Sequence, residues 1–333
     1  MTMTPQTLLA SAGSHDTRPV IAMSEGDDPR IVAGALAARD AGIADIVLVG
    51  NLAMVTAELK ALGRASVGGV SIHDPETSDL SDPLADAFYE LRKHKGMTPE
   101  RARNDLRNPL VYAAMLVRAG HAAGTVGGAV AATPDIVRAA LQVIGKAPDA
   151  PLVSSFFLMF PPNDDGRAMV YADCGLVIDP SSDDQVAIAA ASCNSCKALL
   201  DTDPKVAFLS FSTNGSARHA MVDKVSAAAA MFAEQHPSIP SDGEVQFDTA
   251  FAPSVAIRKA PESTVAGQAN VMIFPSLDAG NIAYKITQRL GGYAAIGPIL
   301  QGLNQPANDL SRGCTADDVT MMIAVTVKQA AKP

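Results

Sequence analysis

Short runs of β-branched and other apolar residues alternate with longer stretches of helical periodicity along most of this sequence. The first unit is strand-like at residues 19–25, helical in the stretch PRIVAGALAARDAG that begins at Pro29, and strand-like again at residues 45–50. Further strand-like runs are VSSFFLMF, MVYADCGLV, KVAFLSFS, VMIFPSL and YAAIGPIL, at residues 153–160, 169–177, 205–212, 271–277 and 293–300. Several of these runs are almost continuously apolar, which is typical of strands covered on both faces. The pattern predicts an α/β fold with largely parallel sheets.

The length of the chain predicts more than one domain, because 333 residues exceed the usual size of a single hydrophobic core. A first boundary is predicted at GKAPDAP, residues 145–151, where a glycine and two prolines separate a helical stretch from a strand. A second is predicted near residues 291–299 from glycine and proline alone. Hydrophobic residues make up 48% of the chain but aromatic residues only 5%, so small and aliphatic side chains must fill the core.

Charge and cysteine content argue against several classes of protein. The formal net charge of −9 repels phosphate backbones, so we expect no nucleic-acid partner. Four unevenly spaced cysteines do not form the disulfide framework of a small secreted protein. The first 15 residues lack the basic segment of a signal peptide, and Arg118 and His121 interrupt the most apolar region. We therefore expect a cytoplasmic protein that does not cross a membrane.

A basic cluster at residues 91–107 stands out in this acidic chain. Its members are Arg92, Lys93, His94, Lys95, Arg101, Arg103 and Arg107. Such a cluster is typical either of a solvated helix face or of a site that binds the phosphates of a nucleotide. The sequence alone leaves both interpretations open.

Two loops that precede helices have features of anion-binding sites. Residues 124–145 contain a loop of small residues and then Thr133 as the expected N-cap, with Arg138 one turn into the helix. Residues 210–225 lead from a strand through Gly215 and Ser216 into another helix. Each loop is interpreted either as an anion cradle at a helix N-terminus or as an ordinary capped turn.

Cys193 and Cys196 form a Cys-x-x-Cys pattern within the alanine-rich stretch VAIAAASCNSCKALL. A zinc site needs a second pair of ligands, and the histidines show no such spacing. We predict that these cysteines are small buried side chains of a helix, and we predict no metal site.

The stretch PANDLSRGCTADD near the end of the chain has two interpretations. Thr315 and Asp318 resemble a capping box, in which the carboxylate three residues into a helix binds back to the N-cap residue. A capping box does not account for Ser311, Arg312 and Gly313 directly before it. A hydroxyl, a guanidinium and a carboxylate in one tight loop, together with the preceding NQPAND, also suit a reaction centre.

The same region resembles the C-terminal signature of the phosphate acetyltransferase (phosphotransacetylase) family, over the stretch GNIAYKITQRLGGYAAIGPILQGLNQPANDLSRGCTADDV at residues 280–319. Other stretches are similar to that family in the same order. They are RKHKGMT, TPDIVRAALQVIG, VSSFFLM, YADCGLVIDP and FLSFSTNGSA. The resemblance extends over roughly residues 20–330.

This resemblance implies reversible transfer of an acetyl group between acetyl phosphate and coenzyme A, with no added cofactor because coenzyme A is a substrate. It also implies two α/β/α domains similar to those of the isocitrate and isopropylmalate dehydrogenases, with the active site in an interdomain cleft. The first domain would comprise residues 1–148 plus 298–333, and the second residues 149–297. The family further implies a homodimer that binds coenzyme A or acetyl-CoA, acetyl phosphate and phosphate.

The resemblance also implies roles for individual residues. Asp318 would be the general base, Ser311 would bind the acyl carbonyl, and Arg312 would bind the leaving phosphate. The further residues expected to bind coenzyme A or substrate, or to lie beside them, are Arg92, Arg138, Lys285, Asn281 and Cys174, the last not as a nucleophile. The chemistry suits these residue types, because a thiol is mostly protonated at neutral pH and its thiolate is the attacking form. Acetyl phosphate is already activated, so no covalent acyl-enzyme is required.

Three alternatives remain at this level. The same scaffold can use butyryl phosphate or another acyl phosphate. Metal-dependent dehydrogenase chemistry would need a cluster of aspartates that the sequence does not show. A silent coenzyme A-binding scaffold would be expected to have lost Ser311, Arg312 or Asp318, and all of these are present.

Overall fold

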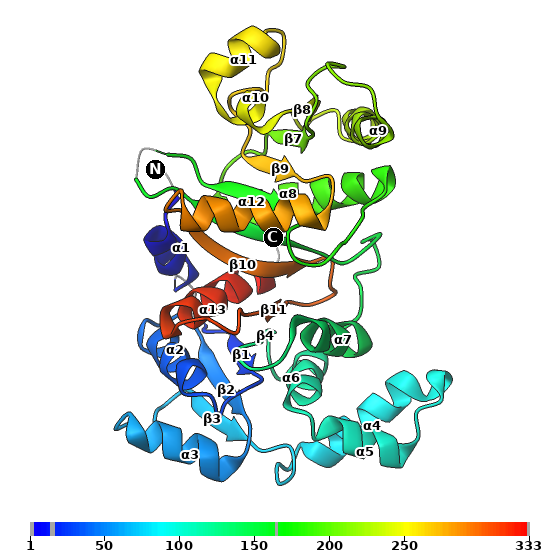
Figure 1. The fold of residues 1–333 in the computed structure, drawn as a ribbon. Helices are drawn as coiled ribbons and strands as arrows, with labels where there is room; N and C mark the ends of the chain where they lie inside the picture. The colour runs from blue at the N-terminus through cyan, green and yellow to red at the C-terminus, as the bar shows by residue number, and fades with distance from the viewer. Residues whose placement is uncertain (1–2, 14–16, 164–165, 332–333) are drawn as a thin grey trace. The chain divides into compact units, whose positions relative to one another are not determined.

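The computed structural model describes residues 3–13, 17–163 and 166–331. The chain divides into two compact units, each of which is described by itself (Figure 1). The terminal unit comprises residues 6–148 and 303–333. The central unit comprises residues 149–302 together with the few described residues before Gln6.

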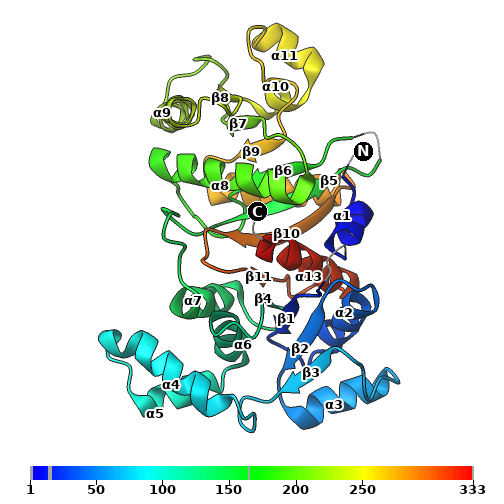
Figure 2. The same ribbon diagram turned by 180° about the vertical axis from the view of Figure 1, so that it is seen from behind.

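Among the described residues, the terminal unit holds a five-stranded parallel sheet in the order β11-β4-β1-β2-β3. Its strands are β1 (Val20–Met23), β2 (Asp45–Val49), β3 (Val70–His73), β4 (Gly124–Gly127) and β11 (Ala307–Asp309). Its helices are α1 (Pro5–Ala12), α2 (Pro29–Asp40), α3 (Leu52–Ala61), α4 (Ser81–Arg92), the 3-10 helix η1 (Lys93–Lys95), α5 (Pro99–Leu106), α6 (Pro109–Arg118), α7 (Thr133–Val143) and α13 (Ala316–Ala330). Helices α2 and α13 pack on one face of this sheet and α6 and α7 on the other, which gives a three-layer α/β/α unit (Figures 1 and 2).

The described part of the central unit holds a six-stranded mixed sheet in the order β10-β5-β6-β9-β7-β8. Its strands are β5 (Ser154–Phe160), β6 (Met169–Ala172), β7 (Val206–Leu209), β8 (Ser241–Val245), β9 (Val271–Ile273) and β10 (Ala294–Gln301). Its helices are α8 (Ser182–Leu200), α9 (Ala220–Gln235), α10 (Phe247–Phe251), α11 (Pro253–Lys259) and α12 (Leu277–Arg289). The pairs β10–β5 and β5–β6 are antiparallel, whereas β6, β9, β7 and β8 run parallel. Helices α8 and α9 contact the sheet, as do α10 and α12.

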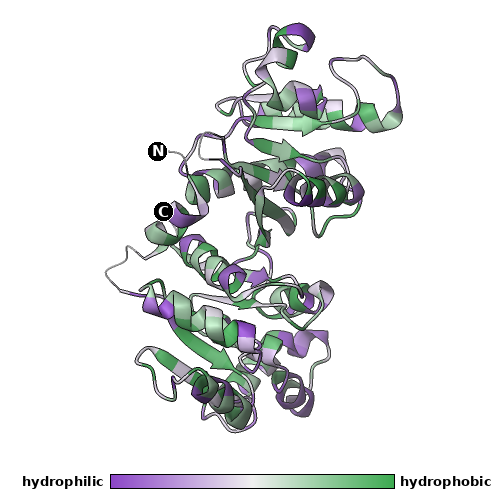
Figure 3. Ribbon diagram, turned by 60° about the vertical axis from the view of Figure 1, so that its left-hand side comes forward, coloured by the Kyte–Doolittle hydropathy of each residue, from purple (hydrophilic) through white to green (hydrophobic). Residues whose placement is uncertain are grey.

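Each unit has its own hydrophobic core, and the apolar strands stand out in green in Figure 3. Phe88 and Tyr112 are fully buried in the terminal unit, and Tyr171 is almost fully buried in the central unit. The rest of both cores is mainly alanine, valine, leucine, isoleucine and methionine. Cys193 and Cys196 are buried in α8, as predicted for small side chains of a helix.

The predicted α/β class with mostly parallel sheets is confirmed, but several short strands were not predicted. The stretch that begins at Gly124 was interpreted as a loop, yet residues 124–127 form β4. A Cβ at Gly124 would lie 2.5 Å from a methyl carbon of Thr326, so glycine lets α13 approach this strand closely. Within NQPAND, likewise read as part of a loop, residues 307–309 form β11. A hydropathy pattern does not indicate these strands, because glycine and polar residues make up most of them.

Candidate active site

The carboxyl ends of β1, β4 and β11 meet at one edge of the parallel sheet in the terminal unit. After β1 the chain adds β2 and β3 on one side and then crosses back to place β4 on the other side of β1. This point, where the direction of strand addition reverses, is where open parallel sheets commonly bind ligands. The loops that begin at Ser24, Gly128 and Leu310 leave the sheet there. The Ser311–Asp318 segment therefore starts from a position suited to a site.

Ser311 lies in a tight turn directly after β11. The amide of Leu310 donates to the Gly127 carbonyl at 2.7 Å, which extends the pairing of β11 with β4. The amide of Gly313 then donates to Ser311 Oγ at 3.2 Å, and that of Cys314 donates to the Ser311 carbonyl at 2.9 Å. The side chains of Ser311 and Arg312 are exposed, whereas Cys314 is buried. The turn thus presents a hydroxyl and a guanidinium on the surface of the terminal unit.

Asp318 forms the predicted capping box at the start of α13. Its Oδ2 accepts hydrogen bonds from the amide of Thr315 at 2.8 Å and from Thr315 Oγ1 at 2.9 Å. The amide of Asp318 donates to Thr315 Oγ1 at 3.2 Å. The box engages Oδ2, while Oδ1 takes no part in it. The side chain is exposed, so Asp318 caps the helix at the surface of the terminal unit.

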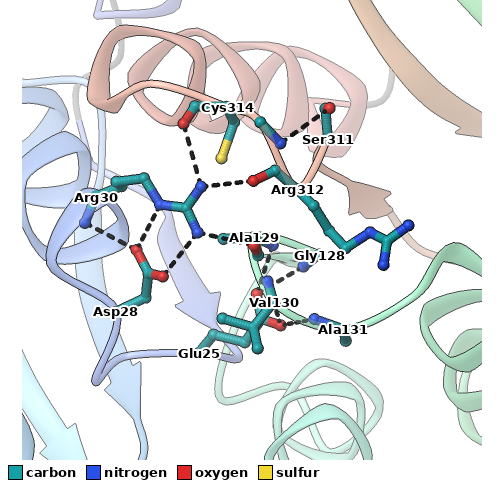
Figure 4. A network of polar contacts seen from close by, with 11 residues as sticks. Glu25, Asp28, Arg30, Gly128, Ala129, Val130, Ala131, Ser311, Arg312 and Cys314 are labelled. Atoms are coloured by element: carbon teal, nitrogen blue, oxygen red, sulfur yellow. Dashed lines mark hydrogen bonds and ion pairs between the residues drawn. The ribbon is translucent and has the colours of Figure 1, made fainter.

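Arg30 in the first turn of α2 clamps the backbone of the turn that carries Arg312 (Figure 4). Its Nη1 donates to the carbonyls of Arg312 at 2.7 Å and Cys314 at 3.4 Å, and its Nη2 donates to the Ala129 carbonyl at 2.8 Å. The same guanidinium pairs with Asp28, the N-cap residue of α2, at 2.8 Å. The hydrogen bond from Arg30 holds the pKa of Asp28 below its usual range. The planar guanidinium of Arg30 therefore joins α2 to two loops at the sheet edge.

Glu25 fills the loop that follows β4 (Figure 4). Its Oε2 accepts from the amides of Gly128 at 2.8 Å and Ala129 at 2.7 Å. Its Oε1 accepts from the amides of Val130 at 3.1 Å and Ala131 at 2.6 Å. These donors are the ones that an anion cradle would offer to a ligand. The interpretation of this loop as an anion cradle is therefore wrong, because an internal carboxylate occupies it.

The sequence predicted Thr133 as the N-cap of α7, and this prediction is wrong. The N-cap is Ala132, and Thr133 Oγ1 instead donates to Asp309 Oδ2 at 2.5 Å. The hydroxyl thus joins α7 to the last residue of β11 rather than capping its own helix.

The loop at residues 210–225 is filled in the same way within the central unit. Glu244 accepts hydrogen bonds from the amide of Gly215 at 2.7 Å and from Ser212 Oγ at 2.9 Å. The hydroxyl of Ser226 also donates to this carboxylate. Helix α9 begins later, at Ala220, with His219 as its N-cap. The second expected anion cradle therefore holds a glutamate as well.

Arg92 and Arg138 lie on different helices of the terminal unit. Arg138 on α7 pairs with Asp135 at 2.6 Å and lines a groove of about 410 Å³ together with Arg101, Asn104 and Asn108. Arg92 ends α4, and its Nε is buried without a hydrogen-bond partner among the described residues. Three of the seven members of the basic cluster are paired with acidic residues, as on a solvated helix face. These pairs are Lys93 with Glu90, Arg101 with Asp105, and Arg103 with Asp82 and Asp86.

In the central unit, Cys174 and Asn281 are in contact. Asn281 Nδ2 donates to the Cys174 carbonyl at 3.0 Å, which joins α12 to the loop after β6. The neighbouring carboxylate of Asp173 accepts from Ser155 and from the amides of Gly175, Leu176 and Val177, and so fixes the shape of this loop. Burial holds the pKa of the Cys174 thiol well above its usual range. Lys285 Nζ lies 5.8 Å from the centre of the Tyr284 ring.

Comparison with known proteins decides the family. A family model described as "Phosphate acetyl/butaryl transferase" matches residues 6–327. The chain belongs to this family. Phosphate acetyltransferase from Paracoccus denitrificans is 47% identical to it over 312 residues, which are 93% of this chain and 94% of that protein. A phosphotransacetylase structure from Streptococcus pyogenes has a TM-score of 0.91 and 41% identity, covering 98% of this chain and 99% of that one. The predicted family is thereby confirmed.

More distant structures share the fold alone. The 4-hydroxythreonine-4-phosphate dehydrogenase of Klebsiella pneumoniae has a TM-score of 0.55 at 13% identity and covers 94% of this chain and 100% of that one. This likeness agrees with the predicted relation of the phosphate acetyl/butyryl transferase fold to dehydrogenase folds. It carries no argument for dehydrogenase chemistry.

Sequence reasoning on this phosphate acetyl/butyryl transferase missed Glu25 and Arg30. A signal for Arg30 was present, since Asp28-Pro29 is an N-cap followed by proline at the first helical position, which places Arg30 in the first turn. The signal for Glu25 is weaker. It is a carboxylate directly after an apolar strand, at the edge where loops gather.

Two further features concern the described residues only. No group of three or more His, Cys, Asp or Glu side chains in this part of the chain is arranged to hold a metal ion. No described helix combines the length and apolar character needed to cross a bilayer.

Proposed function

We propose that this chain catalyses the reversible transfer of an acetyl group between acetyl phosphate and coenzyme A, by direct attack of the thiolate on the acyl carbon. It is an acyltransferase whose relatives named phosphate acetyltransferase are 43–47% identical over nearly the whole chain. The observation that carries the proposal is the Ser311–Asp318 segment. It combines an exposed hydroxyl, an exposed guanidinium and an exposed carboxylate at the sheet edge where ligands commonly bind.

In this proposal Asp318 accepts the proton of the coenzyme A thiol. The capping box engages Oδ2, so Oδ1 can accept the proton while Thr315 keeps the carboxyl group in place. In this proposal bound substrate excludes water from Asp318, so that the thiol proton passes directly to its carboxylate. The capping and catalytic interpretations of Asp318 are compatible, since each uses a different oxygen.

Ser311 and Arg312 would stabilise the charge that develops on the substrate. The Ser311 hydroxyl is assigned to the acyl oxygen as the carbon becomes tetrahedral. The Arg312 guanidinium can bind two oxygens of the departing phosphate at once. The clamp by Arg30 supports this assignment, because it holds the backbone of Arg312 while leaving its side chain exposed.

The remaining assignments concern coenzyme A and assembly. We assign Arg92 and Arg138 to substrate phosphate or coenzyme A, and Lys285 and Asn281 to coenzyme A, with Cys174 as a neighbour that is not a nucleophile. We further propose that the two units are the two domains of the enzyme, that it acts as a homodimer, and that it works in the cytoplasm without a cofactor or metal.

The experiment that tests the proposed function is phosphate-dependent release of free thiol from acetyl-CoA by the purified protein. Release that depends on both substrates supports it, and no release by a folded protein contradicts it. The alternatives are separated by comparing acetyl, propionyl and butyryl phosphate in one thiol-consumption assay. Preference for butyryl phosphate would favour the butyryltransferase alternative, and binding of coenzyme A without turnover would favour the scaffold.

A further inference from the structure

Asp309 is a fully buried carboxyl group two residues before Ser311. It ends β11, and its side chain is 0% exposed. Oδ2 is joined to Thr133 Oγ1 at 2.5 Å. Oδ1 is buried and has no hydrogen-bond partner among the described residues. A buried carboxylate normally has partners on both oxygens, so this group lacks what its charged form would need.

The surroundings of Asp309 offer little compensation for a negative charge. The side chain lies against the backbone of Gly128, where even a Cβ would overlap with Oδ1. The acidic side chain facing it is Glu25, two residues after β1, whose oxygens already accept hydrogen bonds from the amides of the loop after Gly127. Burial raises the pKa of Asp309 to about 7 and Glu25 adds to this rise, whereas the hydrogen bond from Thr133 and the nearby backbone amide of Leu310 oppose it.

The other elements packed around β11 contribute neutral or remote groups. Helix α7 presents the Thr133 hydroxyl, while its Asp135–Arg138 pair is solvent-exposed. Helix α13 presents neutral Thr326 and Gln329 to the neighbouring Asn308. The Arg30 guanidinium is engaged with Asp28 and with backbone carbonyls. None of these groups, within the described residues, pairs Asp309 with a cation.

We propose that Asp309 is a positioning residue that holds a proton at neutral pH and, in this neutral state, keeps the Ser311–Cys314 turn seated on the end of β4. This inference rests on the roles proposed for Ser311 and Arg312. The protonated carboxyl joins β11 to α7 through Thr133, and the next residue, Leu310, continues the pairing with Gly127. Loss of the proton to solvent places a second negative charge beside Glu25. The end of β11 then shifts and moves the turn away from its working position.

The main test compares Asp309→Asn with the wild type and with Asp317→Asn, whose exposed carboxylate lies in the first turn of α13. Asparagine reproduces the neutral carboxyl and cannot ionise. We expect kcat/KM of Asp309→Asn to stay within about twofold of the wild type at pH 6, and the ratio of variant to wild type to rise about tenfold by pH 8. Taking this ratio removes the ionisation of the substrates. The Asp317→Asn ratio should not change with pH.

A second measurement does not depend on turnover. The pKa of Asp309 in the folded protein lies above 3.8, the ordinary value that it has in the unfolded chain. The contribution of this carboxyl group to stability is therefore complete below pH 3.8 and is lost as the pH rises through about 7. The melting temperature of Asp309→Asn relative to the wild type should therefore increase between about pH 4 and pH 7 and level off above. Asp317→Asn should show no such trend.

The possible results separate the two proposals. A flat activity ratio, a flat melting difference, or a folded Asp309→Asn that is inactive at pH 6 would overturn the role of Asp309. If the wild type shows no phosphate-dependent thiol release, the proposed function fails while the melting measurement still tests the proton on Asp309.

If Asp309→Asn does not fold, Thr133→Val replaces it. The Thr133 hydrogen bond lowers the pKa of Asp309, so Thr133→Val should lose activity at a higher alkaline pH than the wild type does. The same pH profile in the variant and the wild type would overturn the inference.

Discussion

At the scale of single residues, the carboxylate of Asp318 caps α13 and is also the group that we propose as the general base. Asp318 caps its helix through Oδ2, and the same bonds to Thr315 hold the carboxyl group at the surface of the terminal unit. The sequence predicted the capping box from residue types and spacing alone. It did not predict Arg30, because hydrogen bonds from a guanidinium to backbone carbonyls 282 and 284 positions away leave no local pattern.

A first prediction at this scale concerns Arg30. Arg30→Lys should reduce kcat about tenfold with a small loss of stability, because an ammonium group cannot bind Asp28 and three carbonyls of two loops at once. Steady-state kinetics and circular dichroism check this. Arg64→Lys, at an exposed pair with Asp40, is the matched control and should leave kcat unchanged. Equal activity of Arg30→Lys and the wild type would show that the clamp does not position the turn.

A second prediction concerns Cys174. Its thiol is fully buried and its pKa is raised well above the usual range by burial, so the thiolate is not available as a nucleophile. Cys174→Ala should retain at least about a tenth of wild-type kcat, since it removes only packing beside Asn281. Acyl-enzyme trapping by mass spectrometry after rapid quench of acetyl phosphate should find no label at this residue. A labelled Cys174, or complete loss of turnover in a folded variant, would contradict the direct transfer mechanism.

At the scale of elements, internal carboxylates shape several of the loops that leave the sheets. Glu25 fills the loop before α7, Glu244 fills the loop before α9, and Asp173 fills the loop after β6. Each carboxylate accepts hydrogen bonds from backbone amides that would otherwise need water or a ligand as their acceptor. Sequence reasoning found that the first two loops suit an anion. It could not find that the anion is a side chain of the same unit, because the glutamates are 103 and 29 positions from the first amides they bind.

A prediction at this scale concerns Glu25→Gln. The amide nitrogen of glutamine would face N–H groups of the loop, so these backbone donors would lose their acceptor. We expect the free energy of unfolding to fall by about 2–4 kcal/mol, and kcat to fall with it because Arg30 also binds Ala129 in this loop. Urea unfolding monitored by circular dichroism checks the stability. Glu76→Gln, an exposed carboxylate, should change it by less than about 0.5 kcal/mol.

Strands of this fold divide into those that hydropathy predicts and those that it does not. The mainly apolar runs at residues 45–50 and 153–160 contain β2 and β5. β4 and β11 are built from glycine, threonine, alanine, asparagine and aspartate around one valine, so only their pairing with β1 and with each other identifies them. Both border the proposed site. The part of the sheet that borders the proposed site was therefore the part that hydropathy indicated least.

At the scale of the whole molecule, family and fold followed from ordered motifs that extend over most of the chain, whereas positions within the site did not. The family match over residues 6–327 agrees with the resemblance seen first in the NDLSRGC segment. Motifs record residue identity, and they do not state which oxygen of Asp318 is engaged or what holds Arg312. Those facts come from contacts between segments that are distant in sequence.

The measurement that tests the central claim most directly is phosphate-dependent thiol release from acetyl-CoA by the wild type, Asp318→Asn and Asp317→Asn, with coenzyme A binding measured in parallel. We predict that Asp318→Asn folds and binds coenzyme A as the wild type does, but turns over at least about tenfold more slowly, whereas Asp317→Asn keeps its rate. Wild-type turnover by a folded Asp318→Asn would contradict the claim that this carboxylate activates the thiol.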